Sequence, residues 1–483
     1  MTINSSERIT KAYGKNLPTT VDKYPTSHDV MEVTSTPWFI DNDFVESSAT
    51  EFIDNTDEEL LRAVDSAEKA FPSWKATSVL ARQQIMLRFV ALIREHWDRL
   101  AAVITLEQGK TLADAKGDVL RGLQVAEAAC GAPELLKGEV LPLGKDLETR
   151  TYMEPLGVVA SICPFNFPAM IPLWSLPIAV VTGNTLILKP SERDPGAVMV
   201  LAELSVNFIL DEPRIQAISF VGSNKVGEYV YTRGSANGKR AQANLGAKNR
   251  QISVAVRQCN SVVKAIAGAA FGAAGQRCMA LSTLVLLPNS DALLAELIKC
   301  AKNLNVNGGF EKDADVGPVI TPESKAGFES VIQSAEDEGA TIGNWIGPTI
   351  ITNVKPHMRC YKEEIFGPVL VCPQVDSFEE AIKLINTNEY GNGVAVFTES
   401  GSTADYFRRN IDAGQVGINV PVPVPLPMFS FTGNKRSIAG GGSSTFYGRP
   451  GVRFYTQQQT VTSRWVHSGS IEAGKAQVVM TYN

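Results

Sequence analysis

One cysteine of the chain stands in a sequence that suits nucleophilic chemistry. Cys278 ends the run FGAAGQRC at 271–278, with Arg277 beside it and two glycines, Gly272 and Gly275, before it. A neighbouring cation lowers the pKa of a thiol, and the thiolate is the form that attacks carbon. Glycine lets backbone pass close to a ligand or take conformations that other residues avoid. The alternative is a small buried cysteine with no chemical role, which is the commoner use of a free cysteine.

The segments on either side of Cys278 must position it. Residues 261–270 are apolar and helix-like, and residues 281–287 are aliphatic and β-branched, as in a buried strand. The cysteine is therefore expected in the loop that joins a helix to a strand.

Upstream of this loop, strand-like and helix-like runs alternate. Polar or small residues follow the strand-like runs: the turn PFNFP at 164–168, then Lys189, then Gly222 and Ser223. Such alternation predicts a parallel sheet that binds its ligand at the carboxyl edge of the strands. No GxGxxG motif is present, so a nucleotide site would depend on Lys189 and Gly222-Ser223, and each of these is a weak signal alone.

The remaining elements follow the same periodicities. A capping box at Thr56–Glu59 opens a helix, and amphipathic helices are expected at 78–96, 112–130, 197–210, 291–304, 378–386 and 404–411. Strands are expected at 38–45, 157–163, 185–190, 217–223, 369–371, 394–397, 416–420 and from Val452 to Trp465.

Composition excludes several classes of function. The chain has 483 residues, a net charge of −6 and 44% hydrophobic residues, which is typical of a globular protein without a basic surface for nucleic acid. No apolar run is long enough to span a membrane. The seven cysteines lack CxxC spacing and the four histidines have no partner at metal-ligand spacing, so no disulfide framework and no metal are expected.

Five motifs together resemble the aldehyde dehydrogenase superfamily over about residues 38–466. They occur in the order and approximate placement of that family: PFNFP at 164–168, KPSE at 189–192, FVGS at 220–223, GQRC at 275–278 and EEIFGP at 363–368. The chain is most similar to the CoA-acylating branch, the methylmalonate-semialdehyde dehydrogenases, through residues 242–249, 275–283 and 423–431.

The resemblance implies catalytic roles. Cys278 would attack the aldehyde carbon, and the side-chain amide of Asn166 with the backbone N–H of Cys278 would stabilise the oxyanion. Arg121 and Arg277 match the arginines that receive the carboxylate of a semialdehyde substrate, for which an arginine fork is suited.

The resemblance also implies that NAD is the cofactor. Lys189 and Glu192 match positions that hold the adenosine ribose, and Gly222 and Ser223 would lie near the pyrophosphate. Glu364 and Phe366 would hold the nicotinamide ribose, and Phe165 is placed among the same cofactor-binding residues.

One departure from the hydrolytic relatives concerns the general base. They carry a glutamate where this chain has Asn244, and an amide cannot take a proton from water near pH 7. The thioester would then last long enough for a second thiol, that of CoA, to take the acyl group. The acylating branch also has asparagine there.

Three functions remain open. The first is NAD-dependent oxidation of methylmalonate or malonate semialdehyde to propionyl-CoA or acetyl-CoA, which by resemblance serves valine and pyrimidine catabolism. The second is a catalytically impaired relative that acts as a binding or structural subunit. The third is a hydrolytic aldehyde dehydrogenase that releases a free acid.

The chain departs from the family pattern in several segments. Between Lys189 and Gly222 it is about twenty residues too short for helix, strand and helix, since one βαβ crossover takes about 30 residues. This predicts the loss of one strand of the nucleotide sheet. Further gaps are expected after Asn55 and near 339–344, and residues 250–259 are unlike the family. Our hypothesis is a splice or gene-model variant.

The fold class predicted is α/β, with a Rossmann-type nucleotide domain, an α/β catalytic domain and a small β oligomerisation element that makes a dimer or tetramer. The expected parts are a polar arm or presequence (1–37), the NAD-binding domain (38–137 and 156–251), the catalytic domain (252–450), and the oligomerisation element with a tail (138–155 and 451–483). The compartment would be the mitochondrial matrix in a eukaryote or the cytosol in a bacterium.

Overall fold

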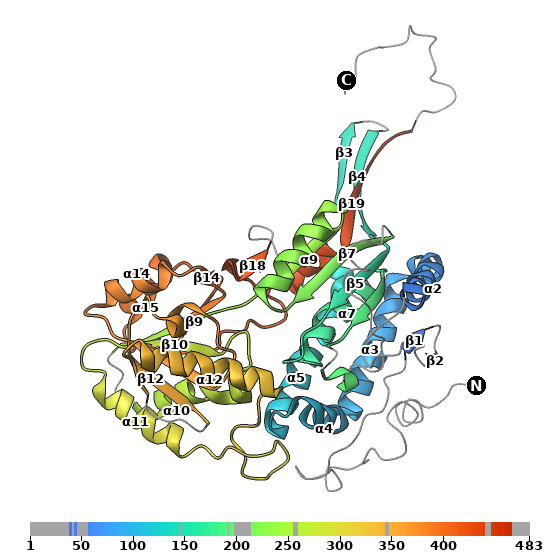
Figure 1. Cartoon of the computed structure of the whole chain (residues 1–483). Helices are drawn as coiled ribbons and strands as arrows, with labels where there is room; N and C mark the ends of the chain where they lie inside the picture. The colour runs from blue at the N-terminus through green and yellow to red at the C-terminus, as the bar shows by residue number, and fades with distance from the viewer. Residues whose placement is uncertain are drawn as a thin grey trace.

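The structure is a computed structural model of the chain. It describes residues 38–40, 43–45, 57–144, 147–191, 193–197, 214–254, 259–342, 347–439 and 446–465. In this part of the chain, two larger sheets carry the helices, and a separate three-stranded sheet projects from them (Figure 1). The polar arm predicted at 1–37 and the gap predicted after Asn55 lie outside the described residues.

The first sheet is built from four parallel strands and one short antiparallel strand. Its order is β18-β8-β7-β5-β6. All five residues of β5 are buried, as expected for a parallel strand covered by helices on both faces. The strands are β5 (Val158–Ile162), β6 (Thr185–Lys189), β7 (Ile215–Val221), β8 (Arg240–Asn244) and β18 (Ile438–Ala439).

Helices from the first half of the chain surround this sheet. α5 packs on α7, and α2 lies against β5 and β6. The helices are α2 (Asp57–Ala76), α3 (Val79–Glu95), α4 (Trp97–Gln108), α5 (Leu112–Ala129), α6 (Ala132–Leu135), α7 (Met170–Val181) and α9 (Asn224–Ala236), with a 3₁₀ turn η2 (Pro195–Ala197).

The second sheet has seven strands in the order β11-β12-β13-β10-β9-β15-β16, and only β11 runs antiparallel to its neighbour. The strands are β9 (Asn249–Ser253), β10 (Leu281–Val285), β11 (Thr341–Ile342), β12 (Thr349–Val354), β13 (Val369–Pro373), β15 (Gly393–Phe397) and β16 (Gln415–Ile418). The helices are α10 (Cys259–Phe271), α11 (Asp291–Lys302), α12 (Pro322–Asp337), α13 (Arg359–Lys362), α14 (Phe378–Asn386), α15 (Gly401–Asn410) and the turn η3 (Gly272–Gly275).

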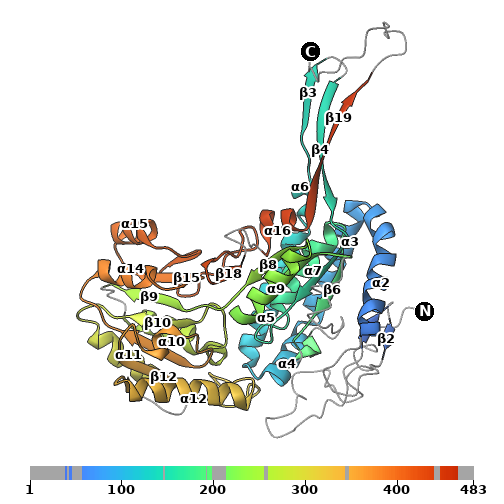
Figure 2. The same cartoon turned by 45° about the horizontal axis from the view of Figure 1, so that its top comes forward.

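The two sheets meet edge to edge because the chain passes from one to the other in four residues. β8 ends at Asn244 and β9 begins at Asn249. The carboxyl edge of the first sheet therefore faces the amino edge of the second, and Figure 2 shows the short link between the two bodies. This junction contains the motifs singled out in the sequence.

The third sheet extends away from both bodies (Figures 1 and 2). Its middle strand β4 (Leu147–Pro155) pairs antiparallel with β3 (Val140–Gly144) and with β19 (Thr456–Arg464), from Thr456 opposite Pro155 to Arg464 opposite Leu147. The pairing of residues 138–155 with the C-terminal strand agrees with the sequence prediction. Two short antiparallel pairs complete the strands: β1 (Trp38–Ile40) with β2 (Asp43–Val45), and β14 (Tyr390–Gly391) with β17 (Asn434–Lys435).

The α/β fold class predicted from the sequence is confirmed, with one local error. Residues 452–454 were expected in a strand, but they form the last turn of α16 (Gly448–Phe454), and the strand begins at Thr456. Val452 is buried against the first-sheet helices, a tertiary contact that outweighs its strand propensity.

No strand within the described ranges pairs with the outer edge of β6. Of the helix predicted at 197–210, only Ala197 is described, as the last residue of the turn η2. The predicted loss of a strand concerns this stretch and stays a prediction. No helix in the described part of the chain is both long and apolar enough to span a membrane.

Candidate active site

Four parallel strands of the first sheet end at the junction, and a residue singled out in the sequence stands at the end of each strand or shortly after it. Ile162, the last residue of β5, is level with Lys189 in β6 and with Phe220 in β7. The next pair along, Val221 and Asn244, closes β7 and β8. The register therefore brings the ends of all four strands to one edge, where doubly wound sheets bind their ligands.

The backbone before Cys278 is held in an unusual conformation. Ala273, Ala274 and Gly275 all have left-handed φ values, of 49°, 53° and 70°. For alanine this conformation costs about 1–2 kcal/mol per residue, so the surroundings must impose it. The backbone N–H of Ala273 donates to the Asp114 carboxylate at 2.9 Å. A Cβ added to Gly275 would lie 2.1 Å from the carbonyl oxygen of Gly367, so the loop is fixed against both α5 and the turn before β13.

Two asparagines fix Cys278 from the side of the second sheet. The carbonyl oxygen of Cys278 accepts hydrogen bonds from Asn249 Nδ2 at 2.7 Å and Asn392 Nδ2 at 3.1 Å. Asn249 also donates to the carbonyl of Ala280 at 2.9 Å and accepts from the N–H of Gly393 at 3.0 Å. One side chain thus joins β9, β10 and β15 at the position of the cysteine.

Cys278 is partly exposed as a residue, whereas Cys130, Cys163, Cys360 and Cys372 are buried. Burial in its surroundings raises the pKa of Cys278 to about 12, and the carboxylate of Glu364 raises it further, while Arg277 opposes them. The thiol is therefore protonated in the free protein at neutral pH. An arginine beside it in sequence does not by itself produce a thiolate.

Asn166 lies where the sequence places an oxyanion donor. It is buried in the turn after β5, and its Nδ2 donates to the carbonyl of Gln276 at 3.0 Å, two residues before Cys278. An amide nitrogen carries two hydrogens, so a second donor is left for an oxygen atom at the cysteine.

Glu364 and Phe366 approach the first sheet from the turn before β13. Glu364 Oε1 accepts the backbone N–H of Ala247 at 2.9 Å, and burial raises its pKa to about 7. A Cβ on Gly246 would lie 2.6 Å from Glu364 Oε2, so this carboxylate occupies space that only glycine leaves. Phe366 meets Phe165 edge to face with ring centroids 5.9 Å apart. Three residues predicted to bind the cofactor, from two distant motifs, are thereby brought together.

Gly222 and Ser223 form the start of helix α9. A Cβ on Gly222 would lie 2.5 Å from the Phe220 ring, so glycine is required there. Ser223 caps the helix, and its Oγ accepts the N–H of Val226 at 3.5 Å. Exposed N–H groups at a helix start suit a phosphate. Lys189 ends β6 on the same edge, whereas Glu192 lies outside the described residues.

The two predicted substrate arginines have different environments. Arg277 forms an ion pair with Asp114 in α5 and donates from Nη1 to the carbonyl of Gly268 at 3.3 Å. A substrate carboxylate would have to compete with Asp114 for it. Arg121 is exposed on α5 and has one weak contact, 3.5 Å from Nη1 to Gln124 Oε1, and no ion pair with any described carboxylate.

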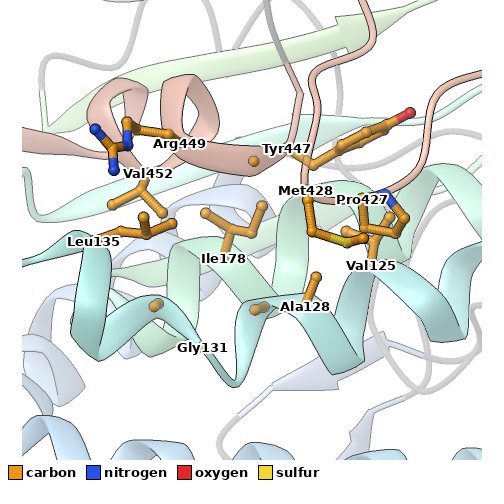
Figure 3. Close-up of a pocket in the computed structure, with 13 residues that line it drawn as sticks. Val125, Ala128, Gly131, Leu135, Ile178, Pro427, Met428, Tyr447, Arg449 and Val452 are labelled. Atoms are coloured by element: carbon orange, nitrogen blue, oxygen red, sulfur yellow. The ribbon is translucent and has the colours of Figure 1, made fainter.

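A cavity of about 340 Å³ adjoins this side of the site (Figure 3). It runs between Val125 and Ala128 of α5 and the segments that carry Met428 and Tyr447. The pKa of Tyr447 is raised by burial; the charge of Arg121 lowers it and that of Cys278 raises it. Tyr447 therefore lines the cavity and is close enough to Arg121 and Cys278 for their charges to act on its hydroxyl.

Asn244 is buried at the end of β8, where hydrolytic relatives were expected to carry a glutamate. Its backbone carbonyl accepts the N–H of Gly222 at 3.1 Å, while its side-chain Oδ1 has no hydrogen-bond partner among the described residues. An amide at this position cannot accept a proton from water.

Several residues of the site were not predicted from the sequence. They contact the loop or turn of a predicted residue from distant parts of the chain, and no local pattern marks them: Lys110, Asp114, Asp118, Asn249, Asn392 and Tyr447. The only available signal was position, because Asn249 and Asn392 each stand directly before or at the start of a strand.

The comparisons with known proteins follow from this geometry. A family model described as "Aldehyde dehydrogenase family" matches residues 41–208 and 205–461. The chain belongs to the aldehyde dehydrogenase family. Members of this family are enzymes, and the prediction of an aldehyde dehydrogenase is confirmed.

Related aldehyde dehydrogenases agree on the branch. The chain is 49% identical to the mitochondrial methylmalonate-semialdehyde/malonate-semialdehyde dehydrogenase [acylating] of Mus musculus, with 95% of each chain covered. It is 48% identical to the protein of that name from Homo sapiens, with 95% of this chain and 94% of the relative covered. The predicted similarity to the acylating branch is confirmed.

Solved aldehyde dehydrogenase structures share the fold. A Sinorhizobium meliloti protein assigned as a methylmalonate-semialdehyde dehydrogenase, solved with NAD, has a TM-score of 0.86 at 36% identity and covers 89% of this chain and 98% of its own. The methylmalonate-semialdehyde dehydrogenase of Oceanimonas doudoroffii has a TM-score of 0.83 at 39% identity and covers 92% of this chain and 97% of its own.

The alignments also contain gaps in this chain relative to other aldehyde dehydrogenases. The family match is broken into two segments that meet at residues 205–208, within the stretch where a strand is predicted to be lost. The alignment with the Mus musculus relative extends over 508 positions, more than the 483 residues of the chain, so the chain has gaps relative to it.

Proposed function

We propose that this aldehyde dehydrogenase oxidises malonate or methylmalonate semialdehyde with NAD and passes the acyl group to CoA, which yields acetyl-CoA or propionyl-CoA with loss of carbon dioxide. The names of the relatives support the substrate and the acyl acceptor. The observation that carries the acylating step is Asn244, an amide where hydrolysis needs a base.

The residues at the first-sheet edge fit NAD. Glu364 lies beside Gly246, the start of α9 offers N–H groups and Lys189 adds a cation. Gly222 and Gly246 carry no Cβ that would overlap the Phe220 ring and the Glu364 carboxylate, so these side chains can lie close to the strand ends. Lys189, Gly222, Ser223, Glu364, Phe165 and Phe366 would hold the cofactor, with Glu192 beyond the described residues. When bound, NAD supplies the hydride acceptor.

The thiol of Cys278 performs the covalent step. Its sulfur forms a bond to the aldehyde carbon as the thiol gives its proton to solvent, and the carbonyl π electrons move to the oxygen. Asn166 Nδ2 and the backbone N–H of Cys278 donate to that oxyanion. Bound NAD would supply the hydride acceptor that turns this adduct into a thioester on Cys278. The free carboxylate of the acyl group would then leave as carbon dioxide, and the carbon that carried it would take a proton from solvent in its place.

Asn244 determines the acyl acceptor, and the arginines determine which substrate binds. Because Asn244 cannot activate water, the thioester persists until the sulfur of CoA forms the new carbon–sulfur bond and Cys278 leaves as the thiolate. Arg121 has no described ion-pair partner and is the better-placed candidate for the substrate carboxylate. Arg277 contributes if it exchanges Asp114 for the substrate.

The site argues against the two other functions. A hydrolytic enzyme needs the base that Asn244 lacks. The left-handed loop at 273–275 holds Gln276 against the amide of Asn166 beside Cys278, and this arrangement favours a catalytic role over a purely structural one. The proposal is completed by oligomerisation through β3, β4 and β19, a location in the mitochondrial matrix, and a place in valine and pyrimidine catabolism. The relatives named above are described as mitochondrial, which supports the location.

The test measures NADH formation from malonate semialdehyde with and without CoA. The proposal expects turnover that depends on CoA and an acyl-CoA product. The matched variant Asn244→Glu should release free acid without CoA. Rapid acid release by the unmodified protein without CoA would refute the acylating function, and absence of NADH under all conditions from folded protein would favour the structural subunit.

A further inference from the structure

An ion pair with no solvent contact lies beneath the turn that carries Asn166. Lys110 Nζ is 3.0 Å from Asp118 Oδ2, and both side chains are 0% exposed. Lys110 precedes α5 and Asp118 lies within it, so the pair belongs to the helix that also contacts the Cys278 loop through Asp114.

The pair holds the turn at several consecutive points. Lys110 Nζ donates to the backbone carbonyl of Asn166 at 2.7 Å and sits 4.5 Å from the centre of the Phe167 ring. Asp118 Oδ1 accepts the backbone N–H of Met170 at 2.7 Å. The segment from Asn166 to Met170 is therefore fastened to α5 by charged groups rather than by apolar packing alone.

The contacts of Asn166 explain why this fastening matters. Its carbonyl is held by Lys110 on one side, and its amide is held by the carbonyl of Gln276 on the other. An oxyanion donor acts only within about 2.7–3.1 Å of the developing charge, so a small displacement of the turn removes much of its effect. A buried ion pair contributes little net stability compared with apolar residues of similar size. Its main contribution here is therefore to fix the position of the turn that carries Asn166.

We infer that Lys110 and Asp118 are positioning residues that fix Asn166 as the donor to the oxyanion at Cys278. The inference rests on the role proposed above for Asn166. It needs neither NAD, CoA nor a particular aldehyde, so it can be tested without them.

The test compares two reactions of the same thiol. Iodoacetamide alkylates Cys278 by forming a sulfur–carbon bond as iodide leaves, and no oxyanion develops. 4-Nitrophenyl acetate acylates it through a tetrahedral oxyanion, and nitrophenolate leaves with the electron pair of the broken carbon–oxygen bond. Both rates depend equally on the thiolate fraction, so their ratio isolates the oxyanion donor. Peptide mapping and the Cys278→Ala variant confirm that Cys278 reacts.

The main variant is Lys110→Met/Asp118→Asn, which removes both charges together so that neither is left buried alone. It should acylate about 10–100-fold more slowly, because it loses part of the 10²–10³-fold effect of an oxyanion donor. Alkylation should stay within about twofold. The matched control is Lys239→Met, which removes another buried lysine that donates to a backbone carbonyl, that of Ile215 at the opposite end of β7. Its ratio of acylation rate to alkylation rate should equal that of the unmodified protein.

The outcomes separate this inference from the proposed function. If Asn166→Ala lowers the ratio of the acylation rate to the alkylation rate and the double variant does not, the positioning role is wrong. If Asn166→Ala leaves the ratio unchanged, the role proposed for Asn166 fails and the inference falls with it. A double variant that loses both reactions equally would indicate a general structural role and also overturn the inference. If the rate ratios are as expected but the protein does not oxidise the semialdehyde, only the proposed substrate or cofactor is refuted.

Discussion

Replacing Gly275 by alanine should disturb the site more than any conservative change elsewhere in the loop. Gly275 has a φ of 70°, and an added Cβ would lie 2.1 Å from the oxygen and 2.6 Å from the carbon of the Gly367 carbonyl. These atoms belong to backbone on both sides, so no side-chain rotation relieves the overlap. Either the Cys278 loop or the turn of Glu364 and Phe366 must move.

The expected cost follows from two contributions. The left-handed conformation costs alanine about 1–2 kcal/mol, and forced overpacking adds about 1–3 kcal/mol. We expect Gly275→Ala to lower the free energy of unfolding by about 2–5 kcal/mol and to slow both turnover and alkylation of Cys278. Urea denaturation measures the first effect and iodoacetamide labelling the second.

Gly268→Ala is the matched control. Gly268 lies in α10 with no atom within 4 Å of an added Cβ. Alanine is favoured over glycine in a helix by about 1 kcal/mol, so this variant should be equally or more stable. The description of the loop would be refuted if Gly275→Ala had the same unfolding midpoint and the same alkylation rate as the unmodified protein.

Three further predictions concern charge and pH. Alkylation of Cys278 should rise about tenfold per pH unit from pH 7 to 10, because its pKa is raised to about 12; a plateau near pH 8 would contradict this. The raised pKa of Glu364, about 7 against 4.5 when unfolded, means that the folded state holds a proton which the unfolded state has lost. Stability should therefore fall by up to about 3 kcal/mol as pH rises through this window, and Glu364→Gln should abolish that part, as urea titrations at each pH would show. Arg121→Gln should raise the KM for a semialdehyde about tenfold, the loss of one charged hydrogen bond, and leave alkylation unchanged; an unchanged KM would exclude Arg121 from substrate binding.

Local signals in the sequence were sufficient for most of the fold. Ser78 caps α3 as its residue type suggests, and the buried run at 157–163 becomes the inner strand β5, between β7 and β6. Residues 452–454 show the limit, since packing of Val452 turned a strand-like sequence into a helix.

The site was less predictable because its contacts join distant residues. The glycines and the cysteine of GQRC mark a loop, but nothing local shows that Arg277 pairs with Asp114, 163 positions away. Nor does any pattern show that Lys110 reaches the carbonyl of Asn166, 56 positions away. Such partners are set by how α5 packs against α7 and meets the Cys278 loop, which depends on the whole fold.

Binding of NAD to the Cys278→Ala protein, measured by calorimetry, tests the central claim most directly. This variant removes the reactive thiol and leaves Lys189, Gly222, Ser223 and Glu364 in place. We expect saturable binding at one site per chain, weakened by Glu364→Gln. Absence of binding to protein that still unfolds cooperatively would contradict the account, because the first sheet would then hold no cofactor and Cys278 could not act in an oxidation.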